Sequence, residues 1–177
     1  SKTATGTFQV MVTSANLVVV KEDNTGMLLL DSRTNAFVRV TGATATPSLA
    51  AGLGDGRLVC QLAGSGGQQL WVFDPLARRA LRLGADQVAP VTYLAKTSDH
   101  RIVYSTGTGN DRRLFLFNPR TGLVRDIAQG VLSTVTVLVN SDDLVFYEVG
   151  VNGQADVYSY DPTEDEIVAV GTSTTDE

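Results

Sequence analysis

The sequence predicts an all-β fold made of four copies of a four-stranded antiparallel unit, each about 43 residues long. Short apolar runs that end in a polar residue recur along the chain. Those polar residues stand at positions 31, 74, 118 and 161, in steps of 43, 44 and 43. A repeat of this length, built from short apolar runs, is typical of arrays of stacked sheets. The longest runs are shorter than a confident amphipathic helix, which favours strands throughout.

Each unit contains four apolar runs, which we name A, B, C and D in chain order. The units span approximately residues 7–41, 47–84, 90–128 and 133–171, and we expect them to form a single domain over residues 1–177. The B runs begin at residues 17, 58, 102 and 144, and the D runs end at 40, 83, 127 and 170. Consecutive strands joined by short turns form antiparallel meanders. The sequence therefore predicts sixteen strands in four sheets and essentially no helix.

The C runs indicate how these sheets pack. Leu70–Phe73 and Leu114–Phe117 are apolar at every position, whereas a sheet with one wet face alternates apolar and polar residues. Both faces of such sheets must be covered, as they are when the blades of a β-propeller stack. This favours a propeller over a sandwich. Ser159 interrupts the fourth C run, so the fourth sheet is expected to be more exposed on one face.

The C runs end in turn sequences of one kind. Asp74-Pro75, Asn118-Pro119 and Asp161-Pro162 each place an acceptor side chain at the first position of a turn and a fixed φ at the second. This combination is preferred in type I turns. We expect a tight turn between runs C and D in each of these three units.

Taken together, the polar turn, the B run, the glycine-bearing hairpin, the aromatic C run, the Asp-Pro turn and the D run resemble the TolB/WD40-like β-propeller repeats. Phe73-Asp74, Phe117-Asn118 and Tyr160-Asp161 stand where related repeats often carry Trp-Asp. The Ser-Pro-Asp-Gly turn common in that family is absent. The resemblance implies a propeller in a periplasmic or secreted setting, while the residues themselves leave the compartment unknown.

Composition excludes several function classes. The formal net charge is −5 and the basic residues form no cluster longer than a pair, which argues against a nucleic-acid partner. Apolar runs are far shorter than the ~20 residues of a membrane-spanning helix, so we expect no membrane insertion. His100 is the only histidine and Cys60 the only cysteine. This pair cannot supply an ordinary zinc site or a disulfide, and we predict no metal, no cofactor and no catalytic set.

The resemblance also implies where a binding surface would lie. In such propellers the B–C and D–A loops form one rim and the A–B and C–D turns form the other. The B–C and D–A loops vary most between the four units, and loops on a rigid scaffold commonly carry function. The binding-rim candidates are Lys21, Glu22, Asp23, Asn24, Ser65, Gln68, Gln87, Thr108, Asn110, Asp111, Gln129, Asn152 and Gln154.

Three function classes remain open at this point. The first is a non-enzymatic propeller module that presents one loop rim to a protein or polymer partner, and it is the reading we favour. The second is a lectin-like propeller that binds a carbohydrate or small ligand, although these loops carry no aromatic residues. The third is a hydrolase or lyase that uses loop carboxylates; its candidates Glu22, Asp23 and Asp111 do not recur at equivalent places.

The four units also predict a closed four-bladed monomer, because the chain begins with an A run and ends with a D run. The alternatives are a fragment of a larger propeller and two halves that meet as an eight-bladed dimer. Light scattering at several protein concentrations distinguishes these outcomes. We expect a mass near 18.8 kDa throughout. A stable dimer of twice that mass would contradict the closed monomer.

Overall fold

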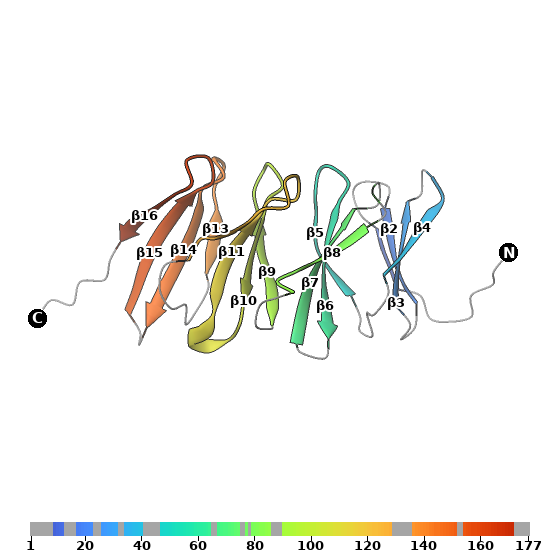
Figure 1. Cartoon of the computed structure of the whole chain (residues 1–177), viewed down its shortest axis with the longest axis horizontal. Coiled ribbons are helices and arrows are strands. Elements are labelled where there is room, and N and C mark those ends of the chain that lie inside the picture. The colour runs from blue at the N-terminus through green and yellow to red at the C-terminus, as the bar shows by residue number, and fades with distance from the viewer. Residues whose placement is uncertain are drawn as a thin grey trace, which may run out of the picture. The chain divides into compact units, whose positions relative to one another are not determined.

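The protein is described by a computed structural model that covers residues 9–12, 17–22, 26–31, 34–40, 47–64, 67–74, 77, 79–85, 90–128, 136–151 and 154–171. The chain divides into two compact units, Ser1–Asp86 and Gln87–Glu177. Each unit holds two four-stranded sheets, whose strands are labelled in Figure 1. The closed ring of four blades stays a prediction.

All four sheets are meanders, with every strand paired antiparallel to its neighbour in the chain. In the first unit one sheet contains β1 (Gln9–Val12), β2 (Leu17–Glu22), β3 (Gly26–Asp31) and β4 (Ala36–Val40), and the other contains β5 (Pro47–Gly52), β6 (Leu58–Gly64), β7 (Gly67–Asp74) and β8 (Arg79–Leu83). In the second unit the third sheet contains β9 (Val91–Lys96), β10 (Ile102–Thr106), β11 (Arg113–Phe117) and β12 (Val124–Asp126), and the fourth contains β13 (Val137–Val139), β14 (Val145–Val151), β15 (Gln154–Asp161) and β16 (Glu166–Gly171).

These strands confirm the predicted runs to within a few residues. The one helix among the described residues is a single 3-10 turn, Gly109–Asp111. None of the described helical structure is long and apolar enough to cross a membrane. The predicted fold class, four four-stranded antiparallel sheets, is therefore what the described part of the chain forms.

The strand register corrects one alignment between the units. The residue before each C-run polar position pairs with an equivalent residue of the B strand, in the pairs Val18–Leu30, Leu58–Phe73, Ile102–Phe117 and Val145–Tyr160. The expected B-run starts at 17 and 144 are each one residue early. Leu144 is apolar and extends the run in the sequence. However, the backbone amide of Asn140 donates to the Leu144 carbonyl, which places Leu144 in the turn.

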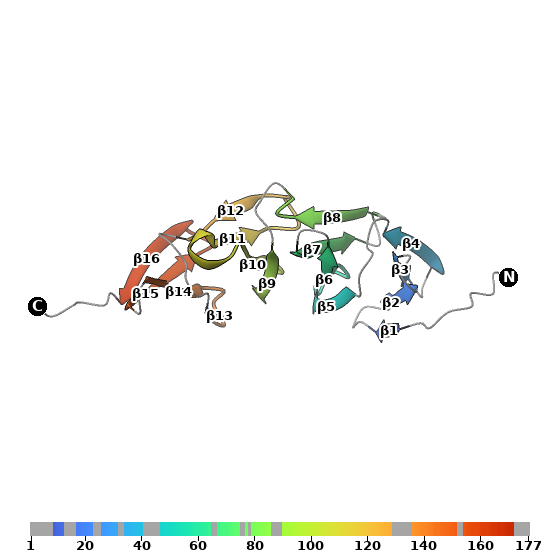
Figure 2. The ribbon, with the colours of Figure 1, turned by 90° about the horizontal axis from the view of Figure 1, so that it is seen from below.

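Apolar packing between the third and fourth sheets forms the core of the second unit. Val103, Leu114 and Leu116 from the third sheet belong to one buried cluster with Val145, Tyr147 and Tyr160 from the fourth. The strands β9 and β13 lie side by side at one end of these two sheets, as Figure 2 shows. The opposite face of the third sheet is buried as well, since Ile102 is 0% and Phe117 2% exposed. The prediction that C strands are covered on both faces is confirmed for this sheet.

The fourth sheet is covered on one face and more exposed on the other. Val157 on β15 is 38% exposed and Val168 on β16 is 47% exposed. Ser159 pairs with Val168 on this face. Ser159 occupies the repeat position that Leu116 fills in the third sheet, where Leu116 is 4% exposed. The expectation that Ser159 marks a more exposed face is confirmed.

This difference in burial gives a matched pair of variants. Leu114 and Val157 stand at the same repeat position, but Leu114 is 0% and Val157 38% exposed. We expect Leu114→Ala to lower the free energy of unfolding by about 2–5 kcal/mol, because it leaves a cavity between two sheets. Val157→Ala should cost less than about 1 kcal/mol, since that side chain is already in partial contact with water. Urea unfolding of both variants tests this, and equal losses would contradict the packing.

Candidate functional site

The strand register assigns the loops of the third sheet to two edges. Thr106 at the end of β10 pairs with Val91, which begins β9, and with Arg113, which begins β11. The D–A and B–C connections of this sheet therefore meet at one edge, and the A–B and C–D turns meet at the other. This agrees with the arrangement that the family resemblance implied.

The B–C connection of the third sheet has a fixed backbone. Gly107 has a φ of +77°, and a Cβ there would lie 2.6 Å from the backbone oxygen of Asp111, so only glycine fits. The Gly107 amide donates to the Pro90 carbonyl at 3.0 Å, and the Asp111 amide donates to the Thr108 carbonyl at 3.2 Å. Thr108 and Asp111 are exposed on this frame. The turn thus presents two polar side chains on an ordered backbone.

Seven of the thirteen binding-rim candidates lie in the described part of the chain. Thr108, Asn110 and Asp111 share the turn just described, Lys21 and Glu22 end β2, Gln68 is exposed in β7, and Gln154 begins β15. The Gln61 amide donates a hydrogen bond to Gln68. The other candidates, Asp23, Asn24, Ser65, Gln87, Gln129 and Asn152, lie outside the described residues. Within the described residues, only the 108–111 group is brought together.

The opposite edge is formed by turns that repeat in detail. In the A–B turns 53–57, 97–101 and 140–144, the first amide donates to the fifth carbonyl and the fourth amide donates to the first carbonyl. The fourth residue has a positive φ in each: 92° at Gly56, 74° at His100 and 65° at Asp143. This pattern is a type I turn followed by a left-handed residue, a common hairpin connection. The single histidine therefore holds a turn position that is glycine in the preceding unit.

The C–D turns confirm the predicted role of their acceptor side chains. Asp74 Oδ1 accepts from the Ala77 amide at 2.9 Å, Asn118 Oδ1 from the Arg120 amide at 2.9 Å, and Asp161 Oδ1 from the Thr163 amide at 2.7 Å. The hydrogen bond from the Thr163 amide is the largest cause that holds the pKa of Asp161 below its usual value. Side chains that bond to a backbone amide two or three residues onward stabilise turns of this kind.

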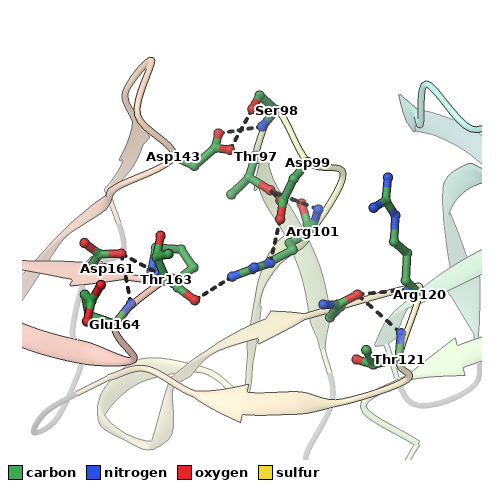
Figure 3. Close-up of polar contacts among 12 residues, drawn as sticks. Thr97, Ser98, Asp99, Arg101, Arg120, Thr121, Asp143, Asp161, Thr163 and Glu164 are labelled. Atoms are coloured by element: carbon green, nitrogen blue, oxygen red, sulfur yellow. Dashed lines mark hydrogen bonds and ion pairs between the residues drawn. The ribbon is translucent and has the colours of Figure 1, made fainter.

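Polar contacts link the third and fourth sheets at this edge (Figure 3). The Ser98 amide and hydroxyl both donate to the Asp143 carboxylate, each at 2.6 Å. Arg101 Nη1 donates to the Pro162 carbonyl at 2.8 Å, while its Nε lies 2.9 Å from Asp99 Oδ2. The guanidinium of Arg101 therefore reaches from one blade to the C–D turn of the next.

A pocket of about 390 Å³ lies between the two sheets beside these contacts. It is lined by Arg101, Leu116, Asn118, Leu123, Val124, Arg125, Tyr160, Pro162 and Asp165. Arg125 Nε contacts Asp165 Oδ1 at 2.8 Å, and the Tyr160 hydroxyl donates to the same oxygen at 2.8 Å. Burial, followed by the Asp165 carboxylate, raises the pKa of Tyr160 to about 12, so this hydroxyl stays protonated as a donor.

None of the pocket residues was among the sequence candidates, which all lie on the other rim. A cavity between blades requires side chains from two sheets, and its lining is not contiguous in the sequence. The signal that could have found it is the alignment of repeats by strand register. That alignment shows which residues of the third unit depart from the other three.

The remaining sequence candidates for chemistry stay apart. Cys60 is 0% exposed, and burial raises the pKa of its thiol to about 12, which suits a buried apolar role. Among the described residues, no group of three or more His, Cys, Asp or Glu side chains is arranged to hold a metal ion.

Comparison with solved structures identifies the sheets. The chain is similar to the tricorn protease, with a TM-score of 0.55 and 13% identity, over 90% of this chain and 16% of that one. It is also similar to a virginiamycin B lyase from Staphylococcus aureus, with a TM-score of 0.53 and 10% identity, over 97% of this chain and 57% of that one. The sheets are β-propeller blades. At this level of identity the likeness establishes the fold alone.

TolB from Acinetobacter baumannii is a further similar structure, with a TM-score of 0.48 and 16% identity, over 92% of this chain and 42% of that one. The chain spans less than two thirds of each of these three proteins. No family model and no curated protein sequence matches it.

The Ser98–Asp143 contact predicts a pH dependence of stability. Burial raises the pKa of Asp143, but the hydrogen bonds from Ser98, then that from the Asp99 amide and the charge of Arg101, outweigh this and lower it overall. A carboxyl whose folded pKa is depressed stabilises the fold above its unfolded pKa of about 3.9, and this contribution is lost as pH falls through the folded value.

We therefore expect Asp143→Asn to lower the Tm at pH 6 and the difference from wild type to shrink below about pH 4. Asparagine tolerates the positive φ at this position, so the backbone is preserved. Asp142→Asn, in the same turn, is the control and should follow the wild-type curve. Thermal unfolding from pH 2 to pH 7 makes the comparison. A constant difference at every pH would rule out a charge-dependent contact.

Proposed function

We propose that this protein is a non-enzymatic propeller module that binds a protein or polymer partner through the rim formed by its B–C and D–A loops. The observation that carries this is the turn that follows β10. Its backbone is fixed by Gly107 and two hydrogen bonds, and it holds Thr108 and Asp111 in contact with solvent. A preordered loop loses little conformational entropy when a partner binds, which favours its use as a recognition element.

The charge of the chain supports a partner other than nucleic acid. The net charge is −5, and a nucleic-acid surface needs several basic side chains that track phosphates. A binding role also fits the propeller scaffold, which supports many unrelated functions through its loops. A second candidate function is the binding of a small ligand, and the observation that favours it is the pocket of about 390 Å³ between the third and fourth blades.

A pair of threonine variants on opposite rims tests the first proposal. Thr108→Arg places a long charged side chain on the B–C rim, and Thr121→Arg places the same side chain on the C–D turn of the same blade. Both threonines are exposed, so both variants should fold. Immobilised wild type and both variants are incubated with an extract of the source cells, and the retained proteins are compared quantitatively.

We expect the partner retained by wild type and Thr121→Arg to be lost from Thr108→Arg. Loss from Thr121→Arg alone would assign the interaction to the opposite rim and refute the proposal. A glycan array with the same three proteins separates the lectin-like alternative. Glycan binding that Thr108→Arg leaves unchanged would also count against a protein-binding B–C rim.

A further inference from the structure

The third blade departs from the other blades at the C–D turn beside the pocket. The position that ends the C strand is an acid in three units, Asp31, Asp74 and Asp161, and a neutral amide in the third, Asn118. The turn itself does not require this change. Asp74, Asn118 and Asp161 all accept a backbone hydrogen bond through the same oxygen.

The consequence falls on an arginine that the second and third blades share. Arg57 and Arg101 occupy the same position at the end of the A–B turn. Arg57 lies 3.5 Å from Asp55 and 3.5 Å from Asp74, so it faces two carboxylates. Arg101 lies 2.9 Å from Asp99, but the counterpart of Asp74 is Asn118, which carries no charge. Arg101 is therefore left with one carboxylate fewer than its equivalent.

A second departure adds a positive charge to the same pocket. The register aligns Arg125 on β12 with Leu81 and Val168, through their pairing with Leu116, Val72 and Ser159. The same position in the first sheet is Val38, the partner of Leu29. An aliphatic residue in three blades is thus an arginine in the third. Both departures shift the charge in the same direction and both line one cavity.

The contacts of these residues leave their donors directed to a ligand. Nε of each arginine is occupied by an acid, Asp99 for Arg101 and Asp165 for Arg125. Arg101 Nη1 bonds to the Pro162 carbonyl, whereas its Nη2 and both Nη atoms of Arg125 have no hydrogen-bond partner among the described residues. Asn118 Oδ1 accepts from the Arg120 and Thr121 amides, which leaves Nδ2 as the donor end of its side chain.

We propose that the pocket between the third and fourth blades binds a monovalent organic carboxylate that carries a small apolar group. Paired arginine donors match the planar, two-oxygen geometry of a carboxylate. Leu116, Leu123, Val124 and Pro162 supply the apolar part of the lining, and about 390 Å³ suits a small molecule. Asp99 and Asp165 already hold the arginines, so a doubly charged phosphate is disfavoured by repulsion. This site is independent of the B–C rim.

The repeat itself supplies the test variants. Asn118→Asp and Arg125→Val each restore the residue type that the other blades carry, so each should preserve the turn and the strand. Arg120→Val is the control, because Arg120 is exposed in the same C–D turn but does not line the pocket. The probes are 4-methylpentanoate, its uncharged analogue 4-methylpentanamide, and inorganic phosphate. Isothermal titration calorimetry measures binding, and circular dichroism verifies that each variant is folded.

We expect saturable binding of 4-methylpentanoate, unchanged in Arg120→Val and weakened about tenfold or more in Asn118→Asp and in Arg125→Val, because each loses a charge-dependent contact. The amide should bind about tenfold more weakly than the carboxylate. Equal binding of amide and carboxylate would overturn the assignment of a carboxylate, and tighter binding of phosphate would overturn it in favour of a phosphate site. Absence of saturable carboxylate binding to wild type, or wild-type affinity in both pocket variants, would overturn the site.

Discussion

The apolar packing of the third blade on the fourth is the interaction on which the pocket depends. Val103, Leu114 and Leu116 are buried against Val145, Tyr147 and Tyr160, and the strands that carry them end in short, hydrogen-bonded turns. Once the two sheets are stacked, the turns at their edge have little freedom to move. The positions of the pocket's arginines and of Asp165 therefore follow from packing that lies well below them in the sheets.

The repeats separate what stacking requires from what it leaves free. The pair formed by Ile102 and Phe117 is matched by Leu58–Phe73 and Val145–Tyr160, and all of these residues are less than 9% exposed. Packing constrains these positions in the same way in each blade. Asn118 and Arg125 lie at the edge of the sheet, where the other blades use an acid and an aliphatic residue. A departure at an edge position costs the core little, so ligand chemistry can be introduced there without loss of the fold.

Most of the fold could be predicted from the sequence because the strands and turns are local. The spacing of the C runs, their lack of alternation and the Asp/Asn-Pro turns predicted the sheets, the buried C strand of the third sheet and the acceptor role of Asp74, Asn118 and Asp161. The start of the fourth B strand was placed one residue early, because hydrophobicity cannot show that the Leu144 carbonyl closes a turn. The pocket was not predicted, because Arg101, Asn118 and Arg125 meet Tyr160 and Asp165 only after two blades stack. Single residues looked unremarkable until the strand register aligned them.

The two edges of the third blade are ordered by different means, and this bears on what each can recognise. The B–C turn is fixed by its own backbone around Gly107, and its exposed side chains contact solvent on a convex surface suited to a large partner. The opposite edge is tied to the next blade through Ser98–Asp143, Arg101–Pro162 and Arg125–Asp165. These contacts immobilise long side chains before any ligand arrives, so much of the entropy that binding would otherwise cost has already been lost in folding. An arginine that is free in solution gains little from one carboxylate, whereas two arginines held in a partly apolar cavity can discriminate charge and size together.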